Sequence, residues 1–379
     1  MMYKRAWAEI DMTAISQNID TLMKMLKPSQ LMGIVKADAY GHGASQIAHV
    51  LIHKGVQQLG VAICEEGIHL RQSGVSAPIL ILGFTPDTLV HEAIHLNLTQ
   101  TVFSLESARE KAMIAKQMNK QATVHIKIDT GMSRLGFLPN DNSINQICEI
   151  MNNPQLNVEG IYTHCATSDS LDNTFMFEQQ ERFEWVIKSL EDRGVHIPVK
   201  HMANSGVFSQ ILRGISSDGL FLDRVRLGIL LYGHPPSLEM ADVCAQLGLK
   251  PAMRLLTQVS MVKKLPANVG ISYGHLYKTA RESTIAVLPI GYADGYPRRL
   301  SHGGQVLING QLAPIAGAIC MDQCMVDVTD IPNVAAGTEV VMLGSTETGI
   351  GADCLADVVG TISYEILCGI GKRVPRVYI

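Results

Sequence analysis

The chain has 379 residues, of which 47% are hydrophobic and 17% are charged, so it can bury a large core and is not a disordered chain. This length exceeds one ordinary domain and suits a barrel-sized domain plus a smaller one. The net charge of -4 comes from interspersed acids and bases. That pattern excludes the basic stripe of a nucleic-acid-binding protein and the polybasic tail of a membrane-surface protein.

Targeting and redox features indicate a cytoplasmic protein. No apolar run approaches the length of a membrane span, and the N-terminus turns acidic at Glu9 before a signal-peptide core can form. The eight cysteines are scattered, and the nearest pair, Cys320 and Cys324, has no second pair to match it. This spacing favours reduced thiols over disulfides or zinc, and no histidine spacing suits a metal, so we expect no metal site.

The first two-thirds of the chain alternates β-rich runs with helix-like stretches. Helical spacing occurs at 45–54, at 104–120 behind the N-cap candidate Ser104, and at 175–193 before Gly194. The eight β-rich runs lie at 31–36, 58–64, 78–83, 98–104, 123–130, 158–164, 199–205 and 223–231.

This alternation predicts an α/β fold whose N-terminal domain, residues 10–236, is a (β/α)8 TIM-type barrel. The alternative, an open doubly wound sheet, calls for a G-x-G-x-x-G turn after an early strand, and the sequence has none. After residue 236 the helical patterning fades, and short β-rich runs predict a mostly β C-terminal domain over 237–379. These runs lie at 254–263, 283–290, 305–308, 313–319, 325–327 and 339–343, with one helix-like segment at 354–359. We expect residues 1–9 to pack on this second domain.

The stretch from Val35 to Gly43 carries the most chemical information. Lys36 ends an apolar run, and Tyr40 and a glycine-rich turn follow it. An amine at the mouth of a strand can form a Schiff base with an aldehyde cofactor, whose phosphate the tyrosine hydroxyl and the N–H groups of the turn can hold. Alone, the stretch is equally typical of a solvated lysine at a strand end.

Polar residues gather at the C-terminal ends of the predicted barrel strands, the face where active sites of this fold lie. Lys127 lies between Ile126 and Ile128, so alternation turns it into the barrel interior, where an unpaired amine is costly. The set at these strand ends comprises Lys36, Lys127, Asp129, Arg134, His164, His201, Asn204, Ser205, Arg224 and Arg226.

Two further groups complete the set of candidate residues. Ser205, Gly228 and Ile229 follow the seventh strand or end the eighth, where this fold usually binds phosphate. In the second domain, tyrosines stand at glycine-flanked positions, in Ser272-Tyr273-Gly274 and in Gly291-Tyr292. Taken singly, each tyrosine is typical of an ordinary turn in a β domain. Together, beside a Schiff-base lysine, they indicate a second acid/base group supplied by another domain or subunit.

Taken together, these motifs make the chain similar to the alanine racemases, a family of fold-type III pyridoxal-phosphate enzymes, over essentially its whole length. The signature Val-x-Lys-Ala-Asp-Ala-Tyr-Gly-His-Gly carries the resemblance, with motifs at 127–136, 162–164, 201–205, 225–232, 272–274, 291–296, 320–322, 362–365 and 373–375. The resemblance implies a homodimer that interconverts L-alanine and D-alanine and supplies D-alanine for peptidoglycan. Each active site is shared between the barrel of one subunit and the β domain of the other.

The resemblance also implies residue roles. Lys36 would hold pyridoxal 5'-phosphate and act as one base, and Tyr273 of the other subunit would be the base on the opposite face of the α-carbon. Arg226 would face the ring nitrogen and, with a pKa above about 12, would not protonate it. The remaining roles are these: phosphate contacts from Tyr40, Ser205, Gly228, Ile229 and Tyr364; ring packing by His164; substrate contacts from Arg134, Tyr292 and Met321; and support from His201, Asp322 and Lys127, which is often carbamylated in this family.

One position departs from the family pattern. Many relatives carry a basic residue two positions before the Cys-Met-Asp run, where this chain has Ala318. A less positive entrance could loosen substrate selection, so a racemase with a serine or broader preference stays an alternative. A basic amino-acid decarboxylase is disfavoured by the short length and the Tyr273 motif, and a single-barrel cofactor carrier would lack the β domain.

Overall fold

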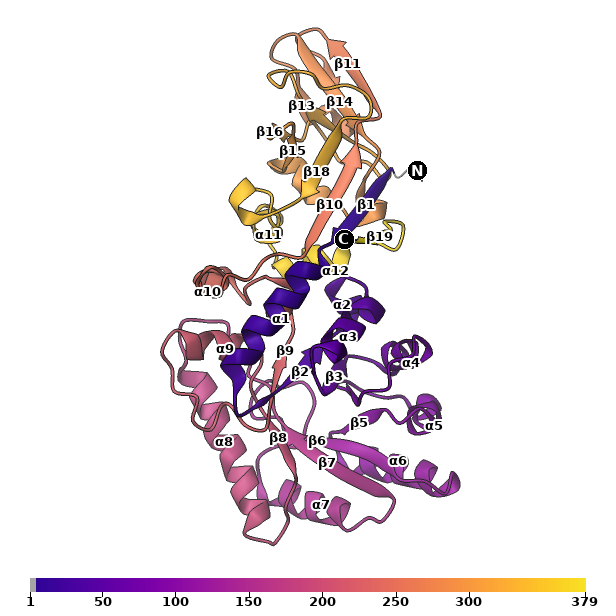
Figure 1. Cartoon of the computed structure of the whole chain (residues 1–379), viewed down its shortest axis with the longest axis vertical. Coiled ribbons are helices and arrows are strands. Elements are labelled where there is room, and N and C mark those ends of the chain that lie inside the picture. Colours follow the sequence, from indigo (N-terminus) through magenta and orange to yellow (C-terminus); the bar gives the residue numbers. More distant parts are fainter. Residues whose placement is uncertain (1–4) are drawn as a thin grey trace. The chain divides into compact units, whose positions relative to one another are not determined.

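The computed structural model describes residues 5–379 and falls into two compact units, whose elements are labelled in Figure 1. One unit contains the described residues up to Ile15, the short segment Tyr40–His42, and Lys250–Ile379. The other contains Ser16–Ala39 and Gly43–Leu249. The first four residues of the segment 1–9, which we expect to pack on the C-terminal domain, lie outside the described residues.

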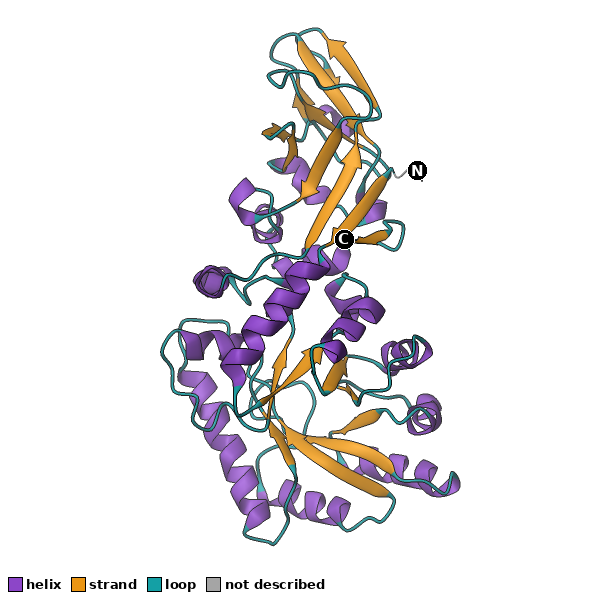
Figure 2. Ribbon diagram, in the orientation of Figure 1, coloured by secondary structure: helices purple, strands orange, loops and turns teal. Residues whose placement is uncertain are grey.

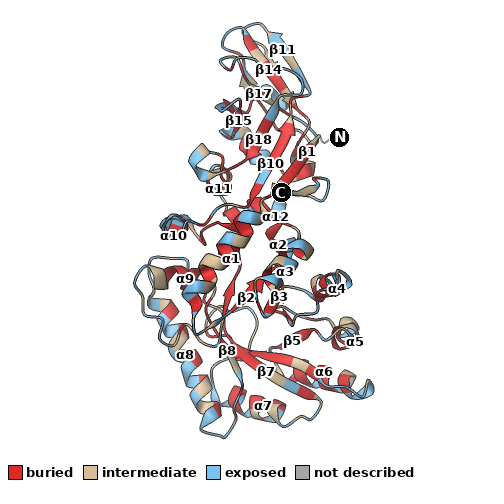
Figure 3. Ribbon diagram, viewed as in Figure 1, coloured by how far each residue is buried: buried red, intermediate tan, exposed pale blue. Residues whose placement is uncertain are grey.

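The second of these units is built on a closed parallel barrel. Each strand pairs in parallel with the next, and the last returns to the first, with Leu31 opposite Val225. β3, β4 and β5 are buried at every position (Figure 3), as expected where helices and core cover both faces of a parallel sheet. The strands are β2 (Gln30–Ile34), β3 (Gln58–Val61), β4 (Ile79–Ile81), β5 (Thr99–Val102), β6 (Ala122–Lys127), β7 (Leu156–Tyr162), β8 (Val199–His201) and β9 (Arg224–Leu227).

The barrel prediction is therefore confirmed, and the doubly wound alternative is wrong. Ser104 caps its helix as predicted, since its side chain accepts the Ser107 N–H at 3.1 Å. Across residues 5–379, no helix combines the length and apolar character needed to cross a membrane. The helices of this part of the chain are α1 (Met12–Leu26), α2 (Lys36–Tyr40), α3 (Ala44–His53), α4 (Cys64–Gln72), α5 (Asp87–His95), α6 (Leu105–Gln117), α7 (Asp141–Met151), α8 (Thr174–Glu191), α9 (Ser205–Leu212), η1 (Ile229–Tyr232), η2 (Leu238–Met240) and α10 (Ala241–Leu247).

Several barrel strands end earlier than predicted. Lys36 and His164 lie two residues beyond the ends of β2 and β7, and Ser205 begins α9 instead of ending a strand. The apolar run continues past the ladder in each case, because the loop residues at the barrel mouth are also buried. Residue type alone therefore does not mark where the pairing stops.

The other unit consists mostly of strands, drawn in orange in Figure 2, which confirms the predicted β domain. Its main sheet has the order β16-β15-β18-β10-β1-β19, so the N-terminal strand β1 lies between β10 and β19. The elements are β1 (Ala6–Ile10), β10 (Met253–Gln258), β11 (Met261–Leu265), β12 (Gly270–Ile271), η3 (Tyr273–His275), β13 (Tyr277–Lys278), β14 (Ser283–Leu288), η4 (Tyr292–Asp294), η5 (Arg298–His302), β15 (Gln305–Ile308), β16 (Gln311–Pro314), β17 (Cys324–Asp327), β18 (Glu339–Leu343), η6 (Thr346–Thr348), α11 (Ala352–Val359), α12 (Ser363–Gly369) and β19 (Arg376–Tyr378).

Two predicted runs in this unit are wrong in detail. The run 254–263 is two strands, β10 and β11. The run 313–319 is mostly not a strand, since β16 ends at Pro314 and Gly317 has a φ of 85°. A Cβ at Gly317 would lie 2.5 Å from the Ile271 carbonyl oxygen, so this segment turns where only glycine fits.

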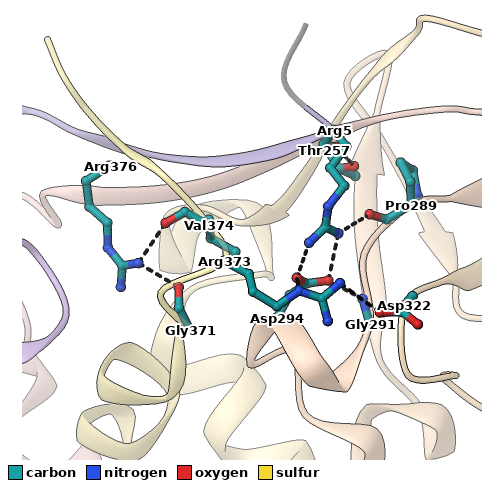
Figure 4. A network of polar contacts seen from close by, with 10 residues as sticks. All are labelled: Arg5, Thr257, Pro289, Gly291, Asp294, Asp322, Gly371, Arg373, Val374 and Arg376. Atoms are coloured by element: carbon teal, nitrogen blue, oxygen red, sulfur yellow. Dashed lines mark hydrogen bonds and ion pairs between the residues drawn. The ribbon is translucent and has the colours of Figure 1, made fainter.

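A buried carboxylate, Asp294, joins the N-terminal strand to the loops around η4 (Figure 4). It is fully buried and accepts hydrogen bonds from both terminal nitrogens of Arg5, with Nη1 at 2.9 Å, and from the Gly291 N–H at 3.1 Å. The Arg373 Nε lies 3.4 Å from the same carboxylate, and its Nη2 donates to Asp322 at 2.8 Å. The Asp294 network therefore links the chain start, η4 and the loop that contains Asp322.

Backbone hydrogen bonds beside the Asp294 network join η4 to the loop that contains Met321. The Tyr292 N–H donates to the Cys320 carbonyl at 3.1 Å, and the Ala293 N–H donates to the Met321 carbonyl at 3.0 Å. Burial of Asp294 opposes its ionisation, but hydrogen bonds from Arg5 and Gly291 and the charge of Arg5 outweigh burial, so its pKa lies below the usual value.

We predict that Asp294→Asn lowers the free energy of unfolding by about 2 kcal/mol at neutral pH, because it leaves the Arg5 guanidinium without its carboxylate. Because the native pKa is depressed, the charged carboxylate stabilises the fold fully above its unfolded pKa of about 3.9, and this stabilisation is lost as the pH falls through the native pKa. Urea unfolding of both proteins at several pH values measures the difference. Asp322→Asn, which removes a half-exposed carboxylate, is the control. Equal losses in the two variants would contradict the central role of Asp294.

Candidate active site

The closed barrel brings the C-terminal ends of its strands to one face, where the predicted polar residues lie. Lys127 is the last residue of β6, His201 is the last residue of β8, and Arg226 lies in β9. All three side chains are buried. The site is therefore a cluster of buried nitrogen-bearing side chains in the mouth of the barrel.

Arg226 is the centre of this cluster. It is 3% exposed, and its Nη1 donates to His201 Nδ1 at 2.9 Å. Its Nη2 lies 3.1 Å from His164 Nδ1 and within 2.9 Å of the Thr163 and Met202 carbonyls. Burial lowers the pKa of Arg226 to about 10, so the guanidinium stays charged at neutral pH. Burial, together with the charge of Arg226, lowers the pKa values of His164 and His201 well below the usual value, so both imidazoles are neutral.

The ring of Tyr162 organises this cluster, although the sequence did not single it out. It stacks on His201, with ring centroids 4.7 Å apart and an interplanar angle of 4°. The Lys127 Nζ lies 4.9 Å from the ring centroid, and the guanidinium carbon of Arg226 lies 5.4 Å from it. The hydroxyl is held by the Leu82 carbonyl at 3.0 Å. Its position in the motif 162–164 was a signal that it belongs to the site.

Lys127 is 5% exposed, as the strand alternation predicts, and its Nζ donates to the Ile128 carbonyl at 3.1 Å. Burial, and then the charge of Arg226, lowers the pKa of this amine well below the usual value. The neighbouring Asp129 carboxylate accepts the N–H groups of Gly131, Ser133 and Arg134 at 2.9–3.0 Å. Asp129 thereby shapes the loop that carries Arg134.

Lys36 begins α2, whose backbone is left-handed. Residues 37–40 have φ values between 51° and 54°, a conformation that costs L-residues about 1–2 kcal/mol each. Glu66 on α4 holds the start of the turn, since its carboxylate accepts the Ala37 N–H at 2.6 Å and the Ala62 N–H at 2.7 Å. Asp38 Oδ1 accepts the Ala44 N–H at 2.7 Å and so links the turn to α3. Spacing along the sequence gives no sign of either the left-handed turn or Glu66.

Two helix starts converge in the barrel unit and form an anion cradle. Ser205, the first residue of α9, accepts the Gly228 N–H through its hydroxyl at 3.1 Å, and Gly228 immediately precedes Ile229 and η1. N–H groups in the first turn of a helix have no acceptor within that helix, so they are available to an anion. Asn204 caps α9 by accepting the Val207 N–H at 3.0 Å.

The residues present fit a phosphate-bearing aldehyde. The anion cradle suits a phosphate, and the amine of Lys36 lies close enough to His164 to lower the pKa of that imidazole, after larger effects of burial and of Arg226. Arg134 and Arg226 add positive charge, and the loop N–H groups already satisfy the neighbouring carboxylate of Asp129. This donor set matches a cofactor with an aldehyde and a phosphate better than it matches a cation.

Tyr40 and Tyr364 lie together in the other unit, with ring centroids 5.8 Å apart. A Cβ at Gly41 would lie 2.4 Å from the Leu367 carbonyl oxygen, so the glycine lets the Tyr40 segment approach α12. The Arg376 Nε donates to the Gly41 carbonyl at 2.9 Å and fixes this approach.

Tyr273 is 73% exposed and follows a strained residue. Ser272 has φ 63° and ψ −174°, a region that is otherwise almost restricted to glycine. Its hydroxyl donates to the Ala318 carbonyl at 2.6 Å. Ala318 itself is 1% exposed. An open groove of about 410 Å³ lies along this turn, lined by Ser272, Tyr273, Gly274, His275, Cys320 and Met325.

The predicted residues thus fall into separate groups. Lys36, Lys127, Arg134, His164, His201, Ser205, Arg226, Gly228 and Ile229 belong to the barrel unit. Tyr40, Tyr364, Tyr273, Tyr292, Met321 and Asp322 belong to the other unit. Tyr292 and Met321 are 42% and 53% exposed.

Comparison with known proteins agrees with this geometry. Residues 10–236 match the family described as "Alanine racemase, N-terminal domain", and residues 252–378 match "Alanine racemase, C-terminal domain". The alanine racemase of Clostridium perfringens is 46% identical over 374 residues, which cover 98% of this chain and 95% of that protein.

Solved structures give the same result. The alanine racemase of Clostridium difficile 630 superposes with a TM-score of 0.94 at 39% identity, covering 100% of this chain and 97% of that one. An alanine racemase from Bartonella henselae with covalently bound pyridoxal phosphate superposes with a TM-score of 0.84 at 29% identity, and each chain is fully covered. The chain belongs to the alanine racemase family.

Proposed function

We propose that this protein is a cytoplasmic alanine racemase that uses pyridoxal 5'-phosphate and supplies D-alanine for peptidoglycan. The observation that carries the proposal is the barrel mouth, where Lys36 on its left-handed turn, the buried Arg226 and the anion cradle occur in one unit. The nearly full-length identity to relatives named alanine racemase supports the same activity.

The cofactor would be held by residues of known position. Ser205, Gly228 and Ile229 would bind its phosphate, Lys36 would bind its aldehyde, and His164 would pack on its ring. The family resemblance adds Tyr40 and Tyr364 at the phosphate. When bound, pyridoxal phosphate withdraws electrons from the α-carbon of an amino acid and makes its proton acidic.

Two bases, one on each face of the α-carbon, explain racemisation directly. Once the substrate amine has taken its place at the aldehyde, the freed Lys36 Nζ would remove or return the proton on one face, and the Tyr273 hydroxyl would do so on the other. We infer that Tyr273 comes from the second subunit of a homodimer. Its exposure and the hydrogen bond that fixes Ser272 support this role, because they present the hydroxyl outward on a rigid turn. Tyr292 and Met321 would line the substrate entrance from the same partner, with Asp322 behind them.

Arg226 keeps its proton, since its pKa of about 10 lies well above neutral pH and its neighbours accept its hydrogen bonds. It therefore cannot protonate a ring nitrogen placed against it, a restraint that would limit side reactions such as transamination.

Arg134 would bind the substrate carboxylate, and Lys127 would orient it. Burial, and then the charges of Arg226 and Arg134, lower the pKa of the Lys127 amine. Addition of carbon dioxide to the unprotonated amine, with release of a proton, would form a negatively charged carbamate and give the two guanidinium groups an anionic partner. His201 would orient Arg226, because its Nδ1 accepts a hydrogen bond from the guanidinium.

The proposed substrate is alanine, and serine is the amino acid from which the site must distinguish it. Serine differs from alanine by one hydroxyl, which a pocket rejects weakly unless it is built to exclude it. Ala318, in place of a basic residue, is the position where this chain differs at the entrance. A serine-preferring or broader racemase of the same fold is the second candidate.

Chiral product analysis tests the proposal. The purified, cofactor-loaded protein is given L-alanine, L-serine and L-lysine separately, and the D-products are quantified. We expect D-alanine to form much faster than the others. Faster D-serine or D-lysine formation would overturn the choice of substrate, and no D-product from any of them would overturn the racemase proposal.

We predict that Tyr273→Phe lowers kcat by at least about a hundredfold, because one face of the α-carbon loses its base. The cofactor should still bind, as measured by its visible absorbance, since Tyr273 is not among the residues proposed to hold it. Tyr378→Phe, at an exposed tyrosine of β19 with no proposed role in the site, is the control and should keep the activity. A fully active Tyr273→Phe variant would disprove the two-base assignment.

We predict that Glu66→Ala weakens cofactor binding by about tenfold, because the Ala37 and Ala62 N–H groups lose their acceptor and the turn behind Lys36 relaxes. Absorbance titration of cofactor-free protein with pyridoxal phosphate measures the affinity. Glu65→Ala, at the adjacent exposed carboxylate, should leave the affinity unchanged. Similar affinities for the two variants would show that Glu66 does not position the turn.

A further inference from the structure

A line of hydrogen-bonded side chains leads from Arg226 through the barrel to a half-exposed carboxylate. Arg226 Nη1 lies 2.9 Å from His201 Nδ1, and His201 Nε2 lies 2.9 Å from His125 Nδ1. His125 Nε2 lies 3.3 Å from Glu159 Oε2. His125 and His201 are 0% exposed, whereas the Glu159 side chain is 37% exposed.

The polarity of this line follows from its first member. A guanidinium has only donors, so His201 Nδ1 must accept, and in a neutral ring the proton is then on Nε2. His201 therefore donates to His125 Nδ1, which leaves the His125 proton on Nε2, directed at Glu159. Burial, followed by other effects, lowers the pKa of both histidines, which agrees with two neutral rings. A carboxylate at the end is the acceptor that this polarity requires.

The pairing of β6 with β7 leaves room for the imidazole of His125, the residue between His201 and Glu159 in this line. His125 on β6 pairs with Gly160 on β7, and a Cβ at Gly160 would lie 2.6 Å from the imidazole ring. A larger residue would push His125 out of line with His201. The register of β6 and β7 also shifts between Val124 and His125, which sets this ring opposite the glycine.

Among the described residues, Glu159 interacts with the neutral His125 and with the positive guanidinium of Arg224. The hydrogen bond from His125 is the largest effect that lowers its pKa, and the charge of Arg224 adds to it. Glu159 is therefore an ionised acceptor at neutral pH, and it is the negative end of a line whose positive end is the buried Arg226.

We propose that His125 and Glu159 are positioning residues, which fix the tautomer and orientation of His201 and through it the orientation of Arg226. This inference rests on the proposed function, in which Arg226 faces the cofactor ring. Without the terminal acceptor, the buried Nε2–H of His125 loses its partner, so the tautomer that Arg226 imposes leaves a costly unsatisfied donor in the barrel. The next ring can then turn or change tautomer, and Arg226 loses a fixed acceptor.

The test compares Glu159→Leu and Glu159→Gln with the control Glu191→Leu. Glu191 is a half-exposed carboxylate, paired with Lys200 at 2.9 Å, on the outside of the same barrel. The first readout is the ¹⁵N chemical shifts of the histidine rings in the full-length protein, which report the tautomer without turnover. The second is the absorbance spectrum of the cofactor-loaded protein, with kcat and KM for alanine.

In Glu159→Leu we expect the ring shifts of His125 and His201 to leave the values of a pure Nε2–H tautomer and the cofactor absorbance to change. We also expect kcat to fall about tenfold, with KM nearly unchanged, because the substrate contacts are intact. Glu159→Gln retains an acceptor oxygen and should stay close to the wild type.

Unchanged ring shifts in Glu159→Leu would overturn the inference, as would an equal loss of kcat in Glu191→Leu. An inactive wild-type protein would overturn the proposed function instead, and the ring shifts would still decide whether Glu159 sets the tautomers.

Discussion

The barrel site depends on the burial of one permanent charge, the Arg226 guanidinium. A buried charge is costly unless its donors are satisfied, and Arg226 is surrounded by acceptors instead of by a carboxylate. Two carbonyls and two neutral imidazoles satisfy the group without neutralising it. A carboxylate in contact would have cancelled the positive potential that an anionic cofactor and an amino-acid carboxylate require.

The buried charge of Arg226 also affects the pKa values of the titratable groups beside it. Burial, together with the charge of Arg226, keeps His164 and His201 neutral and lowers the pKa of the Lys127 amine. Neutral imidazoles can accept from arginine only through one nitrogen, so the arginine dictates where the remaining protons lie. The aromatic face of Tyr162 contributes here because it lies near both Lys127 and Arg226 without adding a formal charge.

Much of this arrangement could be predicted from the sequence, because strand ends of a parallel barrel share one face. Once the eight β-rich runs were recognised, Lys127, His201 and Arg226 had to meet. The supporting groups could not be predicted in this way. Glu66 reaches the Lys36 turn from another helix, and His125 meets His201 across two strand pairings, so neither contact leaves a local spacing. The left-handed turn at 37–40 could not be predicted either, because alanine and tyrosine, which occupy three of its four positions, rarely adopt a positive φ.

The two proposed bases, Lys36 and Tyr273, lie on turns that are held in different ways. Lys36 lies on a turn that is held at both ends, because Glu66 accepts the Ala37 N–H and Asp38 accepts the Ala44 N–H of α3. Tyr273 stands exposed, and its rigidity comes from a strained Ser272 bound to the Ala318 carbonyl. A base that must serve a site outside its own unit cannot be fixed by burial there, so the turn itself has to be stiff. Backbone strain at Ser272, stabilised by one short hydrogen bond, supplies that stiffness where packing cannot.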